Sequence, residues 1–319
     1  MSKIQKIITV GEILVEFVSH RTGCGLSQIG DYSGPYPSGA PAIFLDQAAR
    51  MGAQTQMIGG VGNDGFGHIT LARLKEDGVG IDGVTVCEDH STGVAFVSYY
   101  EDGNRDFIFH LTNTAADQFD LPQSLPDLSQ TLLHISASSL GNDKIRDMVM
   151  TLVRDVDHAG GKVSCDPNAR PELMRNEVVR TAMQHIMERS YCLMPSTSDL
   201  DFLFPELSED QAVAKMLEAK AEVIVVKRGA QGATVVADGM RHDFSGHNVE
   251  EIDPTGAGDC FCGTFISLLT QGISLNEAGH RANAAGAIAV TRRGPMEGNS
   301  TPDEISAFLE KSERIKVTA

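Results

Sequence analysis

Short apolar runs along the chain alternate with longer segments in which apolar residues recur every three or four positions. The short runs predict buried strands at 6–10, 54–58, 132–135, 162–165, 192–194 and 222–226. The longer segments predict amphipathic helices at 42–51, 145–157 and 178–188. This alternation favours an α/β fold in which helices cover both faces of a mostly parallel sheet. Functional sites of such folds lie at the carboxyl ends of the strands.

Two segments depart from that pattern. Residues 12–36 contain short alternating stretches and glycines without a helix pattern, and residues 92–111 predict a hairpin with its turn at 101–104. We expect both segments to form one small sheet near the strand ends, where it could act as a lid that excludes water. The apolar face of this lid could also be the interface of a homodimer, and the two roles are compatible. Because no internal repeat or long linker interrupts the chain, we expect one domain, 1–319, with this lid.

Composition narrows the choice of partners. The 319 residues carry a formal net charge of −17, which argues against nucleic acid and against anionic membrane surfaces, since both require clustered Lys and Arg. No apolar run is long enough to cross a bilayer, and the first residues lack a signal-peptide pattern. The six cysteines show no metal-ligand spacing and are expected to be reduced core residues. We therefore expect a cytoplasmic protein that binds neither nucleic acid nor membranes.

The segment 249–272 is the clearest candidate for chemistry. A strand-like stretch ends at Ile252, the next three residues predict a turn, and an amphipathic helix begins at Gly256-Ala257-Gly258. The first N–H groups of a helix lack intrahelical partners and lie at the positive end of its dipole. Glycines let an anion approach closely, so this helix start is suited to hold the oxygens of a phosphoryl group during transfer.

Asp259 lies in the first turn of the same predicted helix. A carboxylate there can accept the proton of an attacking hydroxyl, and a general base of this kind typically accelerates a reaction by ~10²–10⁴-fold. The alternative is an ordinary first-turn acid that stabilises the helix dipole. That alternative leaves the two glycines unexplained, because each costs about 1 kcal/mol relative to Ala inside a helix.

These residues and three further motifs resemble a known family. Asp253-Pro254-Thr255-Gly256-Ala257-Gly258-Asp259 is similar to the D-T-x-G-A-G-D motif of PfkB-type, ribokinase-like carbohydrate kinases, with Pro254 in place of the commoner Thr. The other matches, in chain order, are Ser38-Gly39-Ala40-Pro41-Ala42, Gly59-Gly60-Val61-Gly62-Asn63-Asp64-Gly65-Phe66-Gly67 and Lys227-Arg228-Gly229-Ala230-Gln231-Gly232. The resemblance implies a ribokinase-like three-layer α/β sandwich with a mostly parallel sheet and a small β lid. It also implies phosphoryl transfer from ATP to a hydroxymethyl group, with Mg²⁺ and in some members K⁺.

The resemblance assigns a role to each matching position. Asp259 would be the base, and Gly256, Ala257 and Gly258 the anion hole. Residues expected on the sugar are Glu16, where the family more often has Asp, together with Gly39 and Ala40. Residues expected along the nucleotide are Ser196, Lys227, Gly229, Gly232 and Asn283. Asp199 would support Mg²⁺ indirectly and Asp253 a monovalent cation. Asp199 could instead be a helix-start acid, and Asn283 a residue of a packed Ala-rich helix.

The choice of sugar depends on the predicted lid. Kinases of 2-keto-3-deoxygluconate hold the acid with a Tyr and an Arg, and here Ile108 and His110 stand at those positions of a strand that begins at Arg105. Arg105 and His110 are the candidate sugar contacts on this strand. Losing a bidentate Arg weakens recognition of a carboxylate. The D-x-N-x-R pattern at 166–170 keeps Asn168 and Arg170 as sugar or phosphate contacts, or as members of a structural ion pair. Ribokinases usually have Asn at Ile43, which makes ribose less favoured.

A neutral ketohexose remains, and the stretch 34–44 most resembles the bacterial tagatose kinases. We therefore expect tagatose or fructose as substrate, with a kinase of 2-keto-3-deoxygluconate as the alternative. Two further classes stay open: a non-catalytic sensor of sugar and nucleotide, and a nucleoside kinase, for which Phe107 and Phe109 could stack on a base. The G-x-G-x-x-G pattern at 60–65 also permits a dinucleotide site, but Asp64 would face the pyrophosphate, so a tight turn beside the substrate is favoured.

Overall fold

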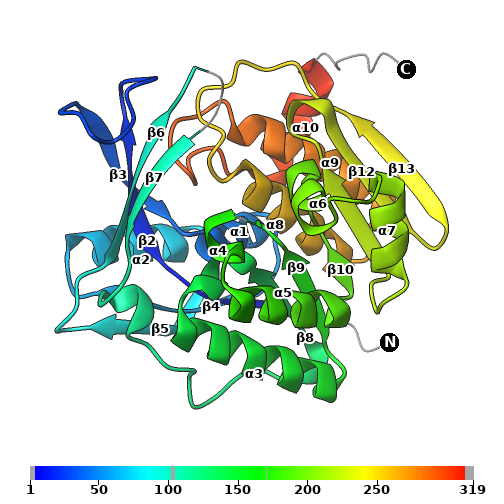
Figure 1. Cartoon of the computed structure of the whole chain (residues 1–319), viewed down its shortest axis with the longest axis horizontal. Coiled ribbons are helices and arrows are strands. Elements are labelled where there is room, and N and C mark those ends of the chain that lie inside the picture. Colours follow the sequence, from blue (N-terminus) through cyan, green and yellow to red (C-terminus); the bar gives the residue numbers. More distant parts are fainter. Residues whose placement is uncertain (1–3, 102–104, 170, 313–319) are drawn as a thin grey trace.

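The computed structural model describes residues 4–101, 105–169 and 171–312, and its main feature is a large sheet (Figure 1). In spatial order its strands are β13 (Met240–Ser245), β12 (Gly232–Ala237), β11 (Val223–Lys227), β10 (Cys192–Leu193), β9 (Lys162–Asp166), β8 (Thr131–Ser136), β1 (Lys6–Val10), β4 (Thr55–Gly62) and β5 (Gly80–Cys87). Neighbouring strands run parallel except at the β11–β12 and β12–β13 pairs. The six predicted strands all lie in this sheet.

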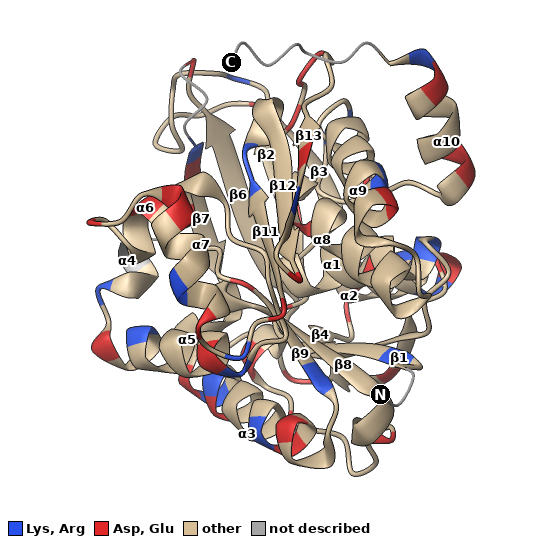
Figure 2. Ribbon diagram, turned by 90° about the vertical axis from the view of Figure 1, so that its right-hand side faces the viewer, with Lys and Arg blue, Asp and Glu red and all other residues tan. Residues whose placement is uncertain are grey.

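Helices cover both faces of the large sheet (Figure 2). They are α1 (Ala40–Arg50), α2 (Gly65–Glu76), α3 (Asp143–Ala159), α4 (Pro171–Met174), α5 (Glu177–Arg189), α6 (Thr197–Leu203), α7 (Glu209–Leu217), α8 (Ala257–Thr270), α9 (Leu275–Ala289) and α10 (Pro302–Lys311). Short 3₁₀ turns lie at Ala115–Asp117, Leu128–Gln130, Ala137–Gly141 and Gly229–Gln231. Within the described ranges, no helix is long and apolar enough to cross a membrane.

Alternate residues of each central strand point into two separate cores. In β1, Ile7 packs with Phe44 of α1 and Phe265 of α8, whereas Ile8 packs in a second core with Val149 of α3. This alternation follows from the two-residue period of a strand, and both faces are apolar because both are covered. The predicted three-layer sandwich is confirmed.

Four strands form a second, smaller sheet in the order β3-β2-β6-β7. They are β2 (Leu14–Ser19), β3 (Tyr32–Ser38), β6 (Gly93–Tyr99) and β7 (Arg105–His110). The sheet stands at one side of the molecule (Figure 1). Strands β6 and β7 pair antiparallel, as expected for a hairpin, and the predicted turn at 101–104 lies largely outside the described residues.

The strand expected to end at Ile252 is absent, which corrects that expectation: residues 246–256 form no strand. The backbone N–H groups of Ile252 and Asp253 instead donate to the carbonyl of Val290, at 2.8 and 3.1 Å. Ile252 is also 47% exposed. Among the described residues, no neighbouring strand pairs with this segment, so it forms an extended loop that leads into α8.

Helices α1 and α8 lie side by side and run in the same direction. A side chain at Gly263 of α8 would place its Cβ 2.5 Å from the carbonyl oxygen of Phe44, so the glycine allows the two backbones to touch. Gln47 donates to Thr264 at 2.9 Å, and Gln271 donates to the carbonyl of Met51 at 2.9 Å. Because the contacts ascend together along both helices, their amino-terminal ends lie at the same edge of the sheet.

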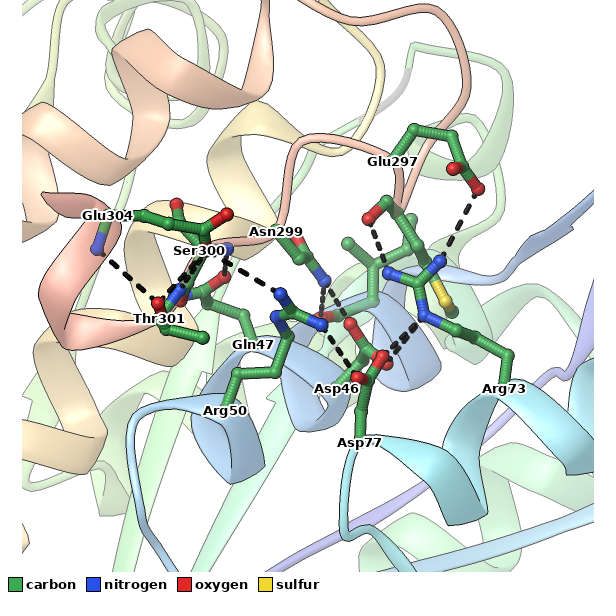
Figure 3. A network of polar contacts seen from close by, with 12 residues as sticks. Asp46, Gln47, Arg50, Arg73, Asp77, Glu297, Asn299, Ser300, Thr301 and Glu304 are labelled. Atoms are coloured by element: carbon green, nitrogen blue, oxygen red, sulfur yellow. Dashed lines mark hydrogen bonds and ion pairs between the residues drawn. The ribbon is translucent and has the colours of Figure 1, made fainter. Parts of the chain in front are cut away.

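A polar network joins α1 and α2 to the segment 297–304 (Figure 3). Asp46 is fully buried, accepts a hydrogen bond from Asn299 at 2.6 Å and faces Arg73 at 3.5 Å. Arg73 and Arg50 both pair with Asp77. Burial raises the pKa of Asp46 to about 7; the charge of Arg73 and the bond from Asn299 oppose this shift, whereas the neighbouring Asp77 adds to it.

This network generates a prediction about pH. The carboxyl pKa of Asp46 is higher in the folded state than its ordinary value of 3.8, so between about pH 4 and pH 7 the folded chain keeps a proton that the unfolded chain has lost. The stabilisation from this group is therefore lost as pH rises through that window. We expect Asp46→Asn to remove this dependence. The free energy of unfolding of the variant minus that of wild type should then increase by on the order of 1–3 kcal/mol from pH 5 to pH 8.

Urea unfolding at both pH values measures the difference, and the exposed Asp89→Asn serves as the matched control. If the difference in free energy of unfolding between wild type and Asp46→Asn were the same at both pH values, the prediction would be wrong.

Candidate active site

The site is built around the start of α8. Gly256 is the residue before the helix, with φ 78°, and a Cβ there would lie 2.3 Å from the carbonyl oxygen of Pro295, so only glycine fits. No side chain caps this helix, unlike α6 or α10, which begin with capping boxes. The N–H of Ala257 donates weakly to the carbonyl of Pro254, at 3.4 Å. The start of α8 is therefore a place where backbone N–H groups, that of Gly258 among them, can bind an anion.

The carboxyl ends of β9 and β11 lie against this helix start. Lys227, the last residue of β11, pairs with Asp166, the last residue of β9. Its ammonium is 3.5 Å from where a Cβ of Gly258 would stand, and it donates to the sulfur of Cys262 at 3.6 Å. Asp259 lies three residues before Cys262 and thus on the same side of α8. The half-buried Asp259 and the Lys227–Asp166 pair are accordingly brought to one region.

The Lys227–Asp166 pair is deeply buried, with side-chain exposures of 13% and 5%. Burial raises the pKa of Asp166, although the charge of Lys227 opposes the shift. Burial alone would lower the pKa of Lys227, but the charge of Asp166 outweighs it and the pKa is raised. Lys227 therefore stays charged beneath the helix start, where a cation favours bound phosphate.

Ser196 and Asp199 together form the capping box that begins α6. One carboxylate oxygen of Asp199 accepts from the N–H and hydroxyl of Ser196, each at 2.7 Å, and the other accepts from the N–H of Ala169 at 2.7 Å. The alternative assigned to Asp199, a helix-start acid, is thus present in the structure. Ser196 also lies beside Lys227 through a parallel bridge, so both predicted nucleotide contacts meet at the ends of β10 and β11.

The remaining predicted nucleotide residues have structural roles of their own. Gly229 and Gly232 adopt φ values of 54° and 99° around the turn between β11 and β12. A Cβ at Gly232 would lie 2.0 Å from the carbonyl oxygen of Phe244. Asn283 is buried in α9 and donates to the carbonyl of Ser245 at 2.8 Å, which joins that helix to the end of β13. Their contact with nucleotide stays a prediction.

The predicted sugar side lies at the start of α1. Gly39 precedes the helix with φ 108°, and a Cβ there would lie 2.4 Å from the carbonyl oxygen of Glu12. Ala40 opens the helix, and Ser38 donates to the carboxylate of Glu16 at 3.3 Å. This helix start is close to that of α8, because Ile43 of α1 lies 3.3 Å from a Cβ placed at Gly256.

Glu12 is a buried acid that the sequence pattern did not single out. It follows β1, and its carboxylate accepts from the hydroxyls of Ser138 and Ser139, which follow β8. Its position at the carboxyl end of a predicted strand was the available signal. Glu12 and Glu16 flank the apolar run Ile13-Leu14-Val15, however, and this pattern gave no reason to prefer Glu12 over Glu16.

Arg105 and His110, both predicted to contact the sugar, lie on opposite faces of the small sheet. Register pairs Glu16 with Ala95, Ala95 with Phe109, and Tyr99 with Arg105, so Arg105 shares a face with Glu16. His110 lies on the opposite face, where its ring meets Phe96 at 6.4 Å. The structure therefore does not bring His110 together with Glu16. Asn168 lies after β9 with φ 38°, and Arg170 lies outside the described residues.

The motif at 59–67 joins the two sheets. Gly60 and Gly62 are inside β4, and Asp64 caps α2 by accepting from the N–H of Gly67 at 2.8 Å. The same carboxylate accepts from the N–H and hydroxyl of Thr92, both at 2.8 Å, just before β6 begins. The carboxylate of Asp64 thus fixes the turn between β4 and α2, in agreement with the turn that the sequence favoured over a dinucleotide site.

Asp253 is fully buried, and both of its carboxylate oxygens accept hydrogen bonds. One accepts from the N–H of Thr255 at 3.0 Å and from the hydroxyl of Tyr99, and the other accepts from the N–H of Gly294 at 2.9 Å. Burial raises the pKa of Tyr99, and the charges of Asp253 and Glu16 add to the shift. Nothing in the sequence pattern singled out Tyr99, because its partner is more than 150 residues away.

The described residues contain no group of three His, Cys, Asp or Glu side chains that could hold a metal ion. Mg²⁺ bound with a nucleotide takes most of its ligands from phosphate oxygens and water. Ser196 and Asp199, at the start of α6, are the residues that could support it indirectly. Asp253 is surrounded by N–H and O–H donors, an arrangement that fits a loop-fixing acceptor better than a direct cation ligand.

The fold and site define a carbohydrate kinase, and comparison with known proteins gives the family. Residues 5–302 match the model of the pfkB family of carbohydrate kinases, so the chain belongs to this family and the predicted kinase class is confirmed. The chain is 30% identical to "Probable fructokinase-3" of Arabidopsis thaliana over 320 residues, covering 97% of this chain and 92% of that protein.

Solved structures agree with this assignment. One is the Escherichia coli structure described as "a putative Ribokinase II in complex with ATP and Mg+2", which is 41% identical, with a TM-score of 0.89 and coverage of 98% of this chain and 100% of the other. Another is a fructokinase of Vibrio cholerae O395 bound to fructose, ADP and calcium, which is 25% identical, with a TM-score of 0.81 and coverage of 97% and 100%.

The buried Lys227–Asp166 pair generates a prediction about stability. Lys227→Met should destabilise the fold by about 3–5 kcal/mol, because it leaves the carboxylate of Asp166 buried without its partner. The double variant Asp166→Asn/Lys227→Met should recover most of that loss, since neither charge remains. Breaking the exposed pair Lys220–Asp157 by Lys220→Met is the control and should cost at most about 1 kcal/mol. Urea unfolding measures all three, and equal losses in the single and double variants would refute the pairing argument.

Proposed function

We propose that this enzyme transfers the γ-phosphoryl group of ATP, as its Mg²⁺ complex, to a hydroxymethyl group of a ketohexose. Fructose or tagatose is the preferred substrate. The observation that carries the proposal is the uncapped start of α8, with Asp259 in its first turn and the charged Lys227 beneath Gly258. The start of α1, with Gly39 and the nearby Glu16, supplies a neighbouring place for the sugar.

The proposed reaction assigns each group a step. Asp259 accepts the proton of the sugar hydroxyl as its oxygen bonds to the γ-phosphorus, and the bond from that phosphorus to the bridging oxygen of ADP breaks. The first-turn N–H groups of α8 stabilise the charge on the transferring phosphoryl oxygens. Mg²⁺ neutralises phosphate charge when bound. The small sheet acts as a lid over the sugar and limits access of water, within the single domain expected for 1–319.

The choice of sugar rests on the similarity of this chain to other sugar kinases. The relatives include proteins named fructokinase, and one structural neighbour holds fructose. Tagatose rests on the resemblance of residues 34–44 to tagatose kinases. Arg105, on the same face as Glu16, is a cation that could meet an acid sugar, so 2-keto-3-deoxygluconate belongs among the substrates to be compared.

The deciding experiment measures ADP formation with Mg-ATP and fructose, tagatose, 2-keto-3-deoxygluconate, ribose or adenosine. We expect a ketohexose to give the highest kcat/KM. Binding of sugar and ATP without turnover of any of them would favour the non-catalytic sensor, and turnover of adenosine alone would favour a nucleoside kinase.

The same assay tests the base. Asp259→Asn should lower kcat by about 10²–10⁴-fold while ATP and sugar still bind, because only the proton acceptor is lost. The control is Asp303→Asn, which changes an exposed first-turn acid of α10 and should leave kcat unchanged. If Asp259→Asn turned over at nearly the wild-type rate, the base would have to be another group.

A second copy of the chain is the proposed partner of the small sheet. β7 is an edge strand of that sheet, and Ile108 on it is 42% exposed on the face opposite Glu16. Sedimentation should give twice the chain mass of 34.2 kDa for wild type and a monomer for Ile108→Asp. Met240→Asp, at an exposed position on the edge strand β13, is the control and should stay dimeric. A monomeric wild type would rule out the dimer.

A further inference from the structure

Asp253 ties together three segments that are far apart in the sequence. Its two oxygens accept hydrogen bonds from Thr255 in its own loop, from Gly294 in the segment after α9, and from Tyr99 at the end of β6. The hydroxyl of Tyr99 also lies 2.5 Å from that of Thr255. Since Asp253 is fully buried, its carboxyl oxygens depend on these donors for hydrogen bonds.

Tyr99 is the only one of these three donors that comes from the small sheet. By register it lies on the same face as Glu16, the predicted sugar contact. A second tyrosine of that sheet, Tyr36 on β3, packs on the segment after α9, because a Cβ at Gly294 would lie 2.7 Å from its ring. The small sheet thus contacts the loop that leads into α8 through the hydroxyl of Tyr99. It contacts the segment after α9, which donates to the same carboxyl of Asp253, through the ring of Tyr36.

The loop fixed in this way contains the proposed catalytic groups. Asp253 and Thr255 immediately precede Gly256, the residue that opens α8, and Asp259 lies in the first turn. A shift of this loop would move the first-turn N–H groups and the base relative to the sugar held by Glu16. Displacements of about 1 Å at reacting groups can cost on the order of 10²-fold in rate.

We propose that Tyr99 is a positioning residue for phosphoryl transfer: its hydroxyl, bonded to Asp253 and Thr255, sets the small sheet and its bound sugar in register with the start of α8. This inference rests on the proposed function, since it assumes that the sugar lies on the Glu16 face. Tyr99 acts through Asp253 and Thr255 and is not itself placed on a reacting atom.

The test is Tyr99→Phe, which removes one oxygen and keeps the ring. We expect kcat to fall by about tenfold, with the KM values for sugar and ATP changing by less than about threefold, because alignment rather than binding is impaired. Amide hydrogen exchange in 253–259 should become faster in the variant, with or without substrate. The control is Tyr100→Phe, which removes a hydroxyl from the adjacent, more exposed tyrosine and should change neither readout.

Two results would overturn the inference: an unchanged kcat with unchanged exchange in 253–259, or a KM for sugar that rises at constant kcat, which would make Tyr99 a sugar contact. Should Tyr99→Phe fail to fold, Thr255→Val removes the other hydroxyl of the pair and should give the same lowered kcat and faster exchange. A wild-type protein without turnover of any sugar would defeat the proposed function, whereas the exchange measurement would still decide whether Tyr99 holds the loop.

Discussion

The parallel packing of α1 against α8 is the contact on which the rest of the site depends. Gly263 lets the backbones of the two helices touch at Phe44, and the contacts advance in step from Ile43 near Gly256 to Met51 at Gln271. Both helices therefore begin at the same edge of the sheet, one at Gly39 and the other at Gly256. This brings the motif expected to hold sugar next to the motif expected to hold phosphate, although more than 200 residues separate them.

Buried charge organises the same edge of the sheet. Lys227 is charged inside the protein because Asp166 lies against it, and the buried carboxyl of Asp253 accepts hydrogen bonds from three converging donors. Such groups are costly to bury unless their partners are held in place. Each therefore fixes the relative position of the segments it joins: β9 with β11 in the first case, and the small sheet with the loop before α8 in the second.

The fold class and the helix start at Gly256 could be predicted because their causes are local. Apolar periodicity sets strands and helices, and two glycines beside an acid at the start of a helix are typical of a turn that binds phosphate. The strand expected to end at Ile252 shows the limit of this reasoning, since the alternating residues there meet no neighbouring strand and bond to Val290 instead. Likewise, the sequence gives no reason to choose between Arg105 and His110 as sugar contacts. Only the register of β6 and β7 shows that they lie on opposite faces of the small sheet.

By itself the sequence determined the order of the elements, the uncapped start of α8 and the family to which the motifs belong, because each of these depends on residues within a few positions of one another. The tertiary structure decided which distant groups meet: Asp166 with Lys227, Glu12 with Ser138 and Ser139, and Asp253 with Tyr99. The physical reason is that a buried charge or hydroxyl is stabilised by whichever partner the packing of strands and helices delivers, and spacing along the chain carries no record of that partner.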